Sequence, residues 1–208
     1  MEKINRELFL SYLEELHGDA KCALEYNNDY ELLISIILSA QTTDKSVNKV
    51  TKELFSKYKD IESLSKAKIE DVERIIKPIG LYKNKAKNII QASIKLTELG
   101  YTKIPNDFYT LIELDGVGRK TANVFLSEYY DENTLGVDTH IDRVAKRLSI
   151  SDENSTVLDT EKRLKEFVQN YNYKKLHHML ISFGRNECKA KNPSCANCKL
   201  KNFCSFKK

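Results

Sequence analysis

Apolar side chains recur at spacings of three and four residues along almost the whole chain, which is the period of an α-helix. The chain has only 7 glycines and 3 prolines, too few turn residues for the many short strands of a β-sandwich or barrel. The pattern also lacks alternating strands and internal repeats. The sequence therefore predicts an all-α protein of about ten helices joined by short connections.

Residues that favour helix ends mark several of the expected boundaries. Asp29, Asp44 and Asp107 each precede an apolar stripe and are predicted N-caps, as is Asp138. Gly184 follows the last stripe and is predicted to end it. The stripes cover residues 4–16, 32–37, 47–58, 69–76, 86–96, 107–114, 122–129, 141–148, 164–168 and 176–183.

The composition excludes two classes of protein. Hydrophobic residues make up 41% of the chain and charged residues 31%, which is typical of a globular protein and not of a disordered one. The longest apolar run, Leu32 to Leu38, is far shorter than the ~20 residues that cross a bilayer. The first residues mix charges and lack the apolar segment of a secretory signal, so we expect a cytosolic protein.

Basic residues are concentrated near the C-terminus. Residues 185–208 contain seven Lys or Arg and one Glu, a net charge of +6, which leaves −2 for the rest of a chain whose total is +4. A solvated lysine-rich tail would give the same count. A basic patch on a nearly neutral body is also typical of proteins that bind a polyanion.

Four of the five cysteines lie within the same basic segment. Cys188, Cys195, Cys198 and Cys204 have the spacing C-x6-C-x2-C-x5-C, whereas Cys22 is alone and is expected to be a small buried residue. In a reducing cytosol such a cluster predicts a metal site and not a pair of disulfides. Zinc and a four-iron cluster both accept four thiolates, so the spacing leaves the two open.

A short glycine motif, Leu-Asp-Gly-Val-Gly-Arg-Lys at residues 114–120, separates two helical stretches. Glycine at Gly116 and Gly118 permits positive φ and a close approach of the backbone to a ligand. A tight turn that leads into a helix N-terminus suits a phosphate group. Taken alone, the motif is equally typical of an ordinary corner between two helices.

Lys120, the last residue of this motif, and Asp138, eighteen residues further on, are candidate catalytic residues. Arg119 and the helix N-terminus both disfavour a positive charge on Lys120, so we expect its amine to have a lowered pKa and to be a nucleophile. Asp138 opens the next apolar stripe, where a carboxylate can cap the helix and also face a cleft. Whether the two side chains share one cleft is a hypothesis at this stage.

In this order and spacing, the glycine hairpin, the Val-Asp-Thr-His segment at 137–140 and the cysteine spacing closely resemble endonuclease III, a family of helix-hairpin-helix DNA glycosylases and abasic-site lyases. The resemblance extends through residues 38–44, 79–82 and 177–185 and so covers almost the whole chain. It implies a six-helix domain at 22–132, and an iron-sulfur cluster domain made of 1–21 and 133–208. Duplex DNA would bind in the cleft between them, and the four cysteines would hold a [4Fe-4S] cluster.

The resemblance also implies a role for individual residues. Lys120 would attack the deoxyribose, release an oxidised pyrimidine and cut the strand 3′ of the site by β-elimination, with Asp138 stabilising positive charge on the sugar. The remaining implied residues bind DNA: Gln41, Leu81, Gly116, Val117, Gly118 and His140. A monomer is the simplest expectation.

Asp115 departs from the leucine-proline-glycine pattern frequent in this family. An acid there should weaken phosphate binding slightly, unless it points away or caps the next helix. Two other functions compete with a bifunctional glycosylase. A monofunctional mismatch glycosylase would not need Lys120, and a non-catalytic DNA-binding module would hold zinc in place of iron.

Overall fold

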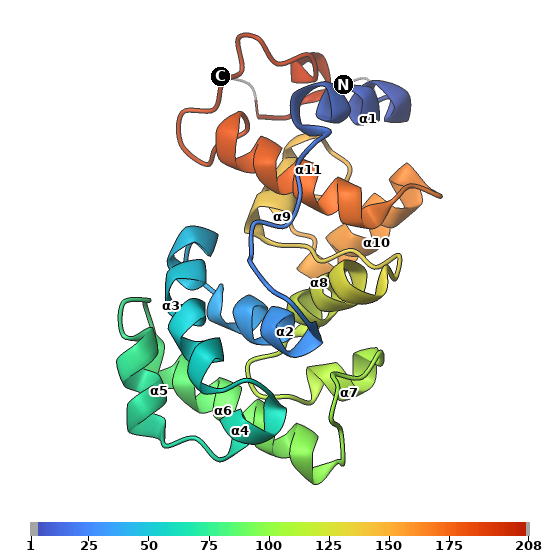
Figure 1. Cartoon of the computed structure of the whole chain (residues 1–208). Coiled ribbons are helices and arrows are strands. Elements are labelled where there is room, and N and C mark those ends of the chain that lie inside the picture. The colour runs from blue at the N-terminus through green and yellow to red at the C-terminus, as the bar shows by residue number, and fades with distance from the viewer. Residues whose placement is uncertain (1–3, 207–208) are drawn as a thin grey trace. The chain divides into compact units, whose positions relative to one another are not determined.

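The computed structural model describes residues 4–206, and every regular element in that range is helical, which confirms the prediction of an all-α fold. The described chain contains eleven α-helices and one short 3₁₀ turn, η1 (Figure 1). In chain order they are α1 Arg6–His17, α2 Asp29–Leu38, α3 Asp44–Lys57, α4 Ile61–Ser65, α5 Ile69–Ile76, α6 Tyr82–Glu98, α7 Phe108–Ile112, α8 Arg119–Tyr130, α9 Thr139–Arg147, α10 Val157–Val168, α11 Tyr173–Asn186 and η1 Lys201–Phe203. Within residues 4–206, no helix is long and apolar enough to span a bilayer.

Two of the predicted N-caps are wrong by one residue. Asn28 caps α2 by accepting the Glu31 N–H at 2.9 Å, and Thr43 caps α3. Asp29 is the first residue of α2 and is buried, where its Oδ2 accepts the N–H of Ile104 at 2.7 Å. Because the Asp29 carboxylate binds the distant Ile104 amide, the preceding residue, Asn28, caps the helix. The predictions for Asp107 and Asp138 are confirmed.

The prediction that Gly184 ends the last helix is wrong, because α11 continues to Asn186. A Cβ atom on Gly184 would lie 2.9 Å from the Cβ of His140, in α9. The glycine therefore permits α9 and α11 to pack closely. The five-residue helix α4 has no counterpart in the predicted pattern, because its two buried apolar residues, Ile61 and Leu64, are too few to define a helical stripe.

The described chain divides into two compact units. The central unit runs from Ala23 to Glu132, and the discontinuous unit joins the residues up to Cys22 with those from Asn133 onward. In the central unit, α2 is buried along almost its entire length and packs against α3, α6 and α8. The helix α6 also packs against α4 and α5, and α7 packs against α8. This packing brings the start of α6, the end of α2 and the turn before α8 into one body.

The discontinuous unit has its own hydrophobic core. The helix α11 lies against α1 and α9, and α9 packs against α10. Side chains from both sequence segments fill the core, including Phe9, Leu13 and Phe183. Leu200, from the C-terminal loop, is fully buried in the same core and fastens that loop to the helices.

Candidate functional site

The glycine motif forms a tight turn between α7 and α8. The Val117 N–H donates to the Leu114 carbonyl at 3.0 Å, and Gly116 has φ +79°, the left-handed value that the third residue of a type II turn requires. A Cβ on Gly116 would also lie 3.0 Å from the Ile37 side chain. Val117 is 5% exposed. Val117 thus anchors the turn in the core, and its amide is already used within the turn.

Gly118 has a different role from Gly116. Its φ of −91° suits any residue, and a Cβ built on it would meet no atom within 4 Å. Gly118 is the N-cap of α8, with no side chain capping the helix. Within the described chain, neither the Gly116 nor the Gly118 N–H donates a hydrogen bond. The turn therefore offers open space and unused amides at the positive end of a helix, the arrangement that binds phosphate.

Asp115 is exposed and does not cap α8, because Gly118 holds the cap position without a side-chain hydrogen bond. Asp115 occupies the second position of the turn, where proline is common because its φ is already suited. Of the two ways in which this acid could be harmless, capping the helix is excluded.

Lys120 lies in the first turn of α8 and is half-buried. The guanidinium of its neighbour Arg119 lies over the ring of Phe108 in α7, 5.1 Å from the centroid. This contact fixes a positive charge beside Lys120 on the same helix end. The lowered pKa that the sequence led us to expect for Lys120 stays a prediction.

Asp138 caps α9 through one of its two carboxylate oxygens. Oδ1 accepts the N–H groups of His140 and Ile141, both at 2.9 Å. Oδ2 accepts no hydrogen bond from a described residue. The capping bonds therefore fix the carboxylate firmly while leaving one oxygen to interact with a ligand.

His140 is half-buried between Asp138 and Gly184. Its Nδ1 lies 3.2 Å from the Arg143 guanidinium, which can only donate, so Nδ1 is the acceptor and the proton is on Nε2. Arg143 also donates to the Gly184 carbonyl at 2.8 Å. Burial lowers the pKa of Arg143, and the negative charge of Asp138 opposes that shift. His140 is thus held with Nε2 as its donor atom, next to Asp138.

Gln41 and Leu81 lie on two exposed turns of the central unit. Both have the left-handed backbone that side chains other than glycine rarely adopt, with φ of 53° and 58°. Leu81 is 56% exposed although it is a large apolar residue. An exposed leucine in an unfavourable backbone conformation makes this turn a candidate functional position.

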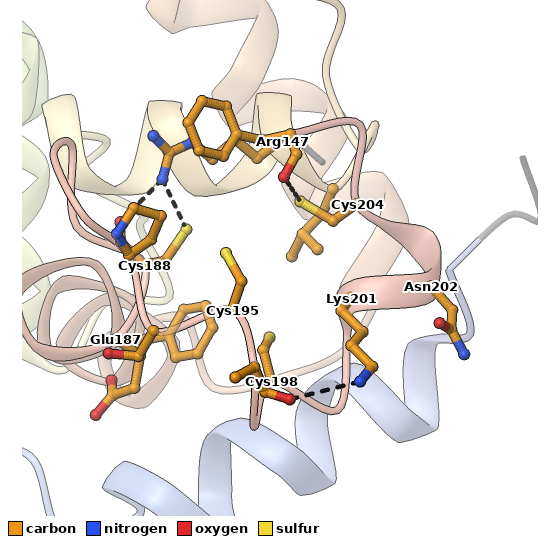
Figure 2. Close-up of a pocket in the computed structure, with 14 residues that line it drawn as sticks. Arg147, Glu187, Cys188, Cys195, Cys198, Lys201, Asn202 and Cys204 are labelled. Carbon is orange, nitrogen blue, oxygen red and sulfur yellow. Dashed lines mark hydrogen bonds between the residues drawn. The ribbon is translucent and has the colours of Figure 1, made fainter. Parts of the chain in front are cut away.

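The four clustered cysteines line one cavity of about 530 Å³. Figure 2 shows their side chains directed toward this common space, below the guanidinium of Arg147. Among the described residues, no three His, Cys, Asp or Glu side chains lie close enough together to hold one metal ion. Zinc needs sulfurs about 2.3 Å from a single centre, whereas a four-iron cluster attaches each thiolate to a different metal atom. The four thiols around this one cavity are a ligand set that either centre accepts.

The thiols are poorly suited to coexist as thiolates without a metal. Burial raises the pKa of Cys198 and of Cys204, and the neighbouring cysteines raise both further. A bound cationic centre would relieve this repulsion. Cys22 lies outside the cavity, in the connection between α1 and α2, and is half-buried, which corrects the expectation that it is a buried residue.

Two arginines of α9 hold the cysteine loop, and the sequence pattern missed both. Arg147 donates to the Cys188 sulfur at 3.3 Å and to the Lys189 carbonyl at 2.8 Å, and its guanidinium lies 3.8 Å from the ring centroid of Phe206 (Figure 2). Arg143 donates to the Cys188 carbonyl at 3.1 Å. More than forty residues separate these partners in the chain. No local pattern could have paired them.

The basic residues of the C-terminal segment lie on its surface. Arg185, Lys189, Lys191, Lys199 and Lys201 are all exposed, and Lys207 and Lys208 lie outside the described residues. Lys199 bonds to Glu15 of α1, whereas Lys189 and Lys191 form no ion pair with a described residue. Exposed lysines beside the cavity loop make this part of the surface a candidate contact for an anion.

Comparison with known proteins places these features in a family context. A model of the HhH-GPD superfamily base excision DNA repair proteins matches residues 34–170. Endonuclease III of Bacillus subtilis (strain 168) is 43% identical over 198 residues, which cover 95% of this chain and 90% of the relative. Endonuclease III of Escherichia coli (strain K12) is 38% identical over 207 residues, which cover 100% and 98%.

Solved structures give the same result. A trapped endonuclease III–DNA covalent intermediate has a TM-score of 0.91 and 40% identity, covering 97% of this chain and 96% of that one. A thermostable thymine-DNA glycosylase has a TM-score of 0.85 at 22% identity, covering 97% and 95%, which shows a shared fold.

Proposed function

Because this chain belongs to the endonuclease III family of HhH-GPD base excision DNA repair proteins, we propose that Lys120 and Asp138 carry out its chemistry. The chain is a DNA glycosylase with abasic-site lyase activity, and its partner is duplex DNA. The position of Lys120 carries the proposal, since its amine follows directly after a turn whose amides can bind phosphate. That a related enzyme was trapped as a covalent complex with DNA supports a covalent route.

The proposed reaction begins when the damaged nucleotide leaves the base stack, because its sugar cannot be attacked inside the duplex. The neutral Nζ of Lys120 bonds to C1′, the C1′–N bond breaks, and the base leaves with the electron pair of that bond. Loss of the amine proton and opening of the sugar ring give a Schiff base. Removal of a C2′ proton then expels the 3′ oxygen, and water releases Lys120.

Asp138 has an electrostatic role in this scheme. Positive charge develops on the sugar as the base departs, and a carboxylate held in a fixed position stabilises it. The bonds from His140 and Ile141 to Oδ1 hold Asp138 in place, and Oδ2 has no hydrogen bond to a described residue. His140, with its proton on Nε2, is a proposed donor to the DNA backbone.

Oxidised pyrimidines are the proposed substrates, and Gln41 and Leu81 are proposed to enter the space that the extruded base leaves. We also propose that the protein is a monomer and that it acts on the DNA of the nucleoid in the cytosol. Incubating the purified protein with duplexes that each carry one lesion tests the substrate class. Excision confined to mismatched adenine would contradict it.

The glycines of the hairpin should differ in effect when replaced. Gly116→Ala should destabilise the fold by about 1–3 kcal/mol, because alanine disfavours φ +79° and its Cβ would press on Ile37. Gly118→Ala should change stability by less than about 1 kcal/mol yet weaken DNA binding, because its Cβ would fill open space beside the unused amides. Chemical denaturation and DNA titration measure the two effects. Wild-type affinity in Gly118→Ala would argue against phosphate binding at the turn.

We propose that the four-cysteine cavity holds a [4Fe-4S] cluster. The convergence of four thiols on one cavity supports this proposal, as does the Arg147 hydrogen bond to the Cys188 sulfur. When bound, the cluster would cross-link the loop covalently. The exposed basic residues Lys189 and Lys191 of that loop are then held in place for contact with phosphate.

Iron content provides the test of this cofactor. The purified protein should absorb broadly in the visible range and contain about four iron atoms per chain. Cys198→Ser should lose most of this iron and the visible band. Cys22→Ser is the matched control and should retain both, because Cys22 lies outside the cavity. A colourless wild-type protein that contains stoichiometric zinc would contradict the proposal.

A further inference from the structure

Lys85 of α6 is a buried lysine that the proposed chemistry does not use. It is 4% exposed and forms no ion pair with any described residue. Its Nζ donates to the Thr42 hydroxyl at 2.6 Å. Burial lowers the pKa of Lys85. Burying an ammonium group without a carboxylate partner is costly. A contribution to stability therefore does not explain a lysine at this position.

The position of Lys85 joins two separate turns. Its ammonium group donates to the Thr42 hydroxyl, and that hydroxyl donates to the Ala40 carbonyl at 3.4 Å. The two hydrogen bonds therefore involve the residues immediately before and after Gln41. Lys85 also lies one helical turn after Leu81, because its backbone N–H makes the first hydrogen bond of α6, to the Leu81 carbonyl at 3.0 Å. One residue thus contacts the segment that presents Gln41 and the segment that presents Leu81.

Both presented residues have unfavourable backbone conformations. Gln41 and Leu81 have positive φ, and such conformations persist only where the surrounding contacts impose them. The Thr42 N–H donates to Ser39 at 3.0 Å and closes the Gln41 turn, but no side chain caps α6 at Leu81. The Lys85 ammonium is the side-chain contact that ties the Gln41 turn to α6.

We propose that Lys85 is a positioning residue: its ammonium group ties the Gln41 turn to the first turn of α6, which follows Leu81, and so holds Gln41 and Leu81 in one fixed arrangement for entry into the base stack. The proposal rests on the proposed function, since it assumes that these two residues enter the DNA. Presenting both in a preformed arrangement lowers the cost of ordering them when DNA binds. Lys85 itself remains beneath the turns and touches no substrate.

The test compares Lys85→Met and Thr42→Val, which remove the two ends of the hydrogen bond while largely preserving volume. Each should slow single-turnover excision of a damaged base from duplex DNA about tenfold or more, and cleavage of a preformed abasic site much less. An extruded base has to be unstacked in the first reaction only. Thr42→Ser, which keeps the hydroxyl, should restore most of the rate lost in Thr42→Val. Lys66→Met removes an exposed lysine of the α4 C-cap and should match the wild type.

Base unstacking can be measured directly, and a loss of unstacking would not be expected if Lys85 only stabilised the fold. With 2-aminopurine opposite a tetrahydrofuran abasic-site analogue, saturating wild-type protein should raise the fluorescence, and Lys85→Met should give a much smaller rise. Asp138→Asn should keep the full rise, because it acts after extrusion. The thermal midpoint of Lys85→Met should be equal to or above that of the wild type, since a buried charge is removed.

The double variant Lys85→Met with Thr42→Val should be no slower than the slower single variant, because both break one bond. Independent, multiplying losses would overturn the proposal, as would a full fluorescence rise in Lys85→Met. If Lys85→Met unfolds at a much lower temperature, Thr42→Val alone decides, and normal unstacking in that variant overturns the proposal. Failure of the wild-type protein to form a covalent adduct with DNA would instead overturn the proposed function.

Discussion

Replacing Lys120 with alanine is expected to abolish the adduct that borohydride traps between the protein and abasic DNA. The adduct requires a primary amine that forms a Schiff base with C1′, and Lys120 is the amine directly after the glycine turn that we propose binds phosphate. Strand cleavage should fall by on the order of 10³-fold or more, as when other covalent nucleophiles are removed. Gel electrophoresis of the reduced complex, followed by mass spectrometry of the linked peptide, measures this loss.

Binding provides the control for Lys120. Lys120→Ala should still bind a tetrahydrofuran abasic-site analogue, because the turn amides and the fold remain. Lys66→Ala, which changes an exposed lysine paired with Glu62, should keep the adduct at wild-type yield. A deoxyribose linked to any other side chain, or cleavage by Lys120→Ala at the wild-type rate, would show that the assignment is wrong.

The second large effect is expected for Asp138→Asn. Base excision should fall by about 10²–10³-fold, the usual effect of removing one electrostatic contact to developing charge. Cleavage of a preformed abasic site should fall less, because no base is expelled in that reaction. Single-turnover rates on a lesion duplex and on an abasic duplex of the same sequence separate the two steps.

Stability distinguishes this role from helix capping. Asparagine caps helices about as well as aspartate, so the Oδ1 bonds to His140 and Ile141 should survive and the thermal midpoint should change little. Asp138→Ala removes the cap as well and should lower stability by about 1 kcal/mol. Equal losses of excision and abasic-site cleavage in Asp138→Asn would favour a purely structural role.

Local patterns were sufficient for much of the fold. The all-α class and the N-cap roles of Asp107 and Asp138 were predicted correctly, because helical period and capping depend on neighbours within a few residues. The errors at Asp29 and Gly184 have a common cause. Asp29 binds the distant Ile104 amide, and Gly184 accommodates the packing of His140, so contacts far along the chain decided their roles.

The candidate site divides in the same way. The order of the glycine turn, Lys120, Asp138 and the cysteines could be read from the chain, and so could the chemistry of each side chain. The structure then separated Gly116, which the turn requires, from Gly118, which the fold leaves open. It also showed that Val117 anchors the turn through burial.

The amino-acid sequence by itself determined where most of the helices form and which side chains can act as nucleophile, carboxylate or metal ligand, because these properties are local or belong to the residue type. Only the tertiary structure decided that Arg147 bonds to the Cys188 sulfur and that Lys85 lies buried against Thr42. Burial and hydrogen bonding between distant residues depend on how complete helices pack, and no spacing along the chain encodes that packing.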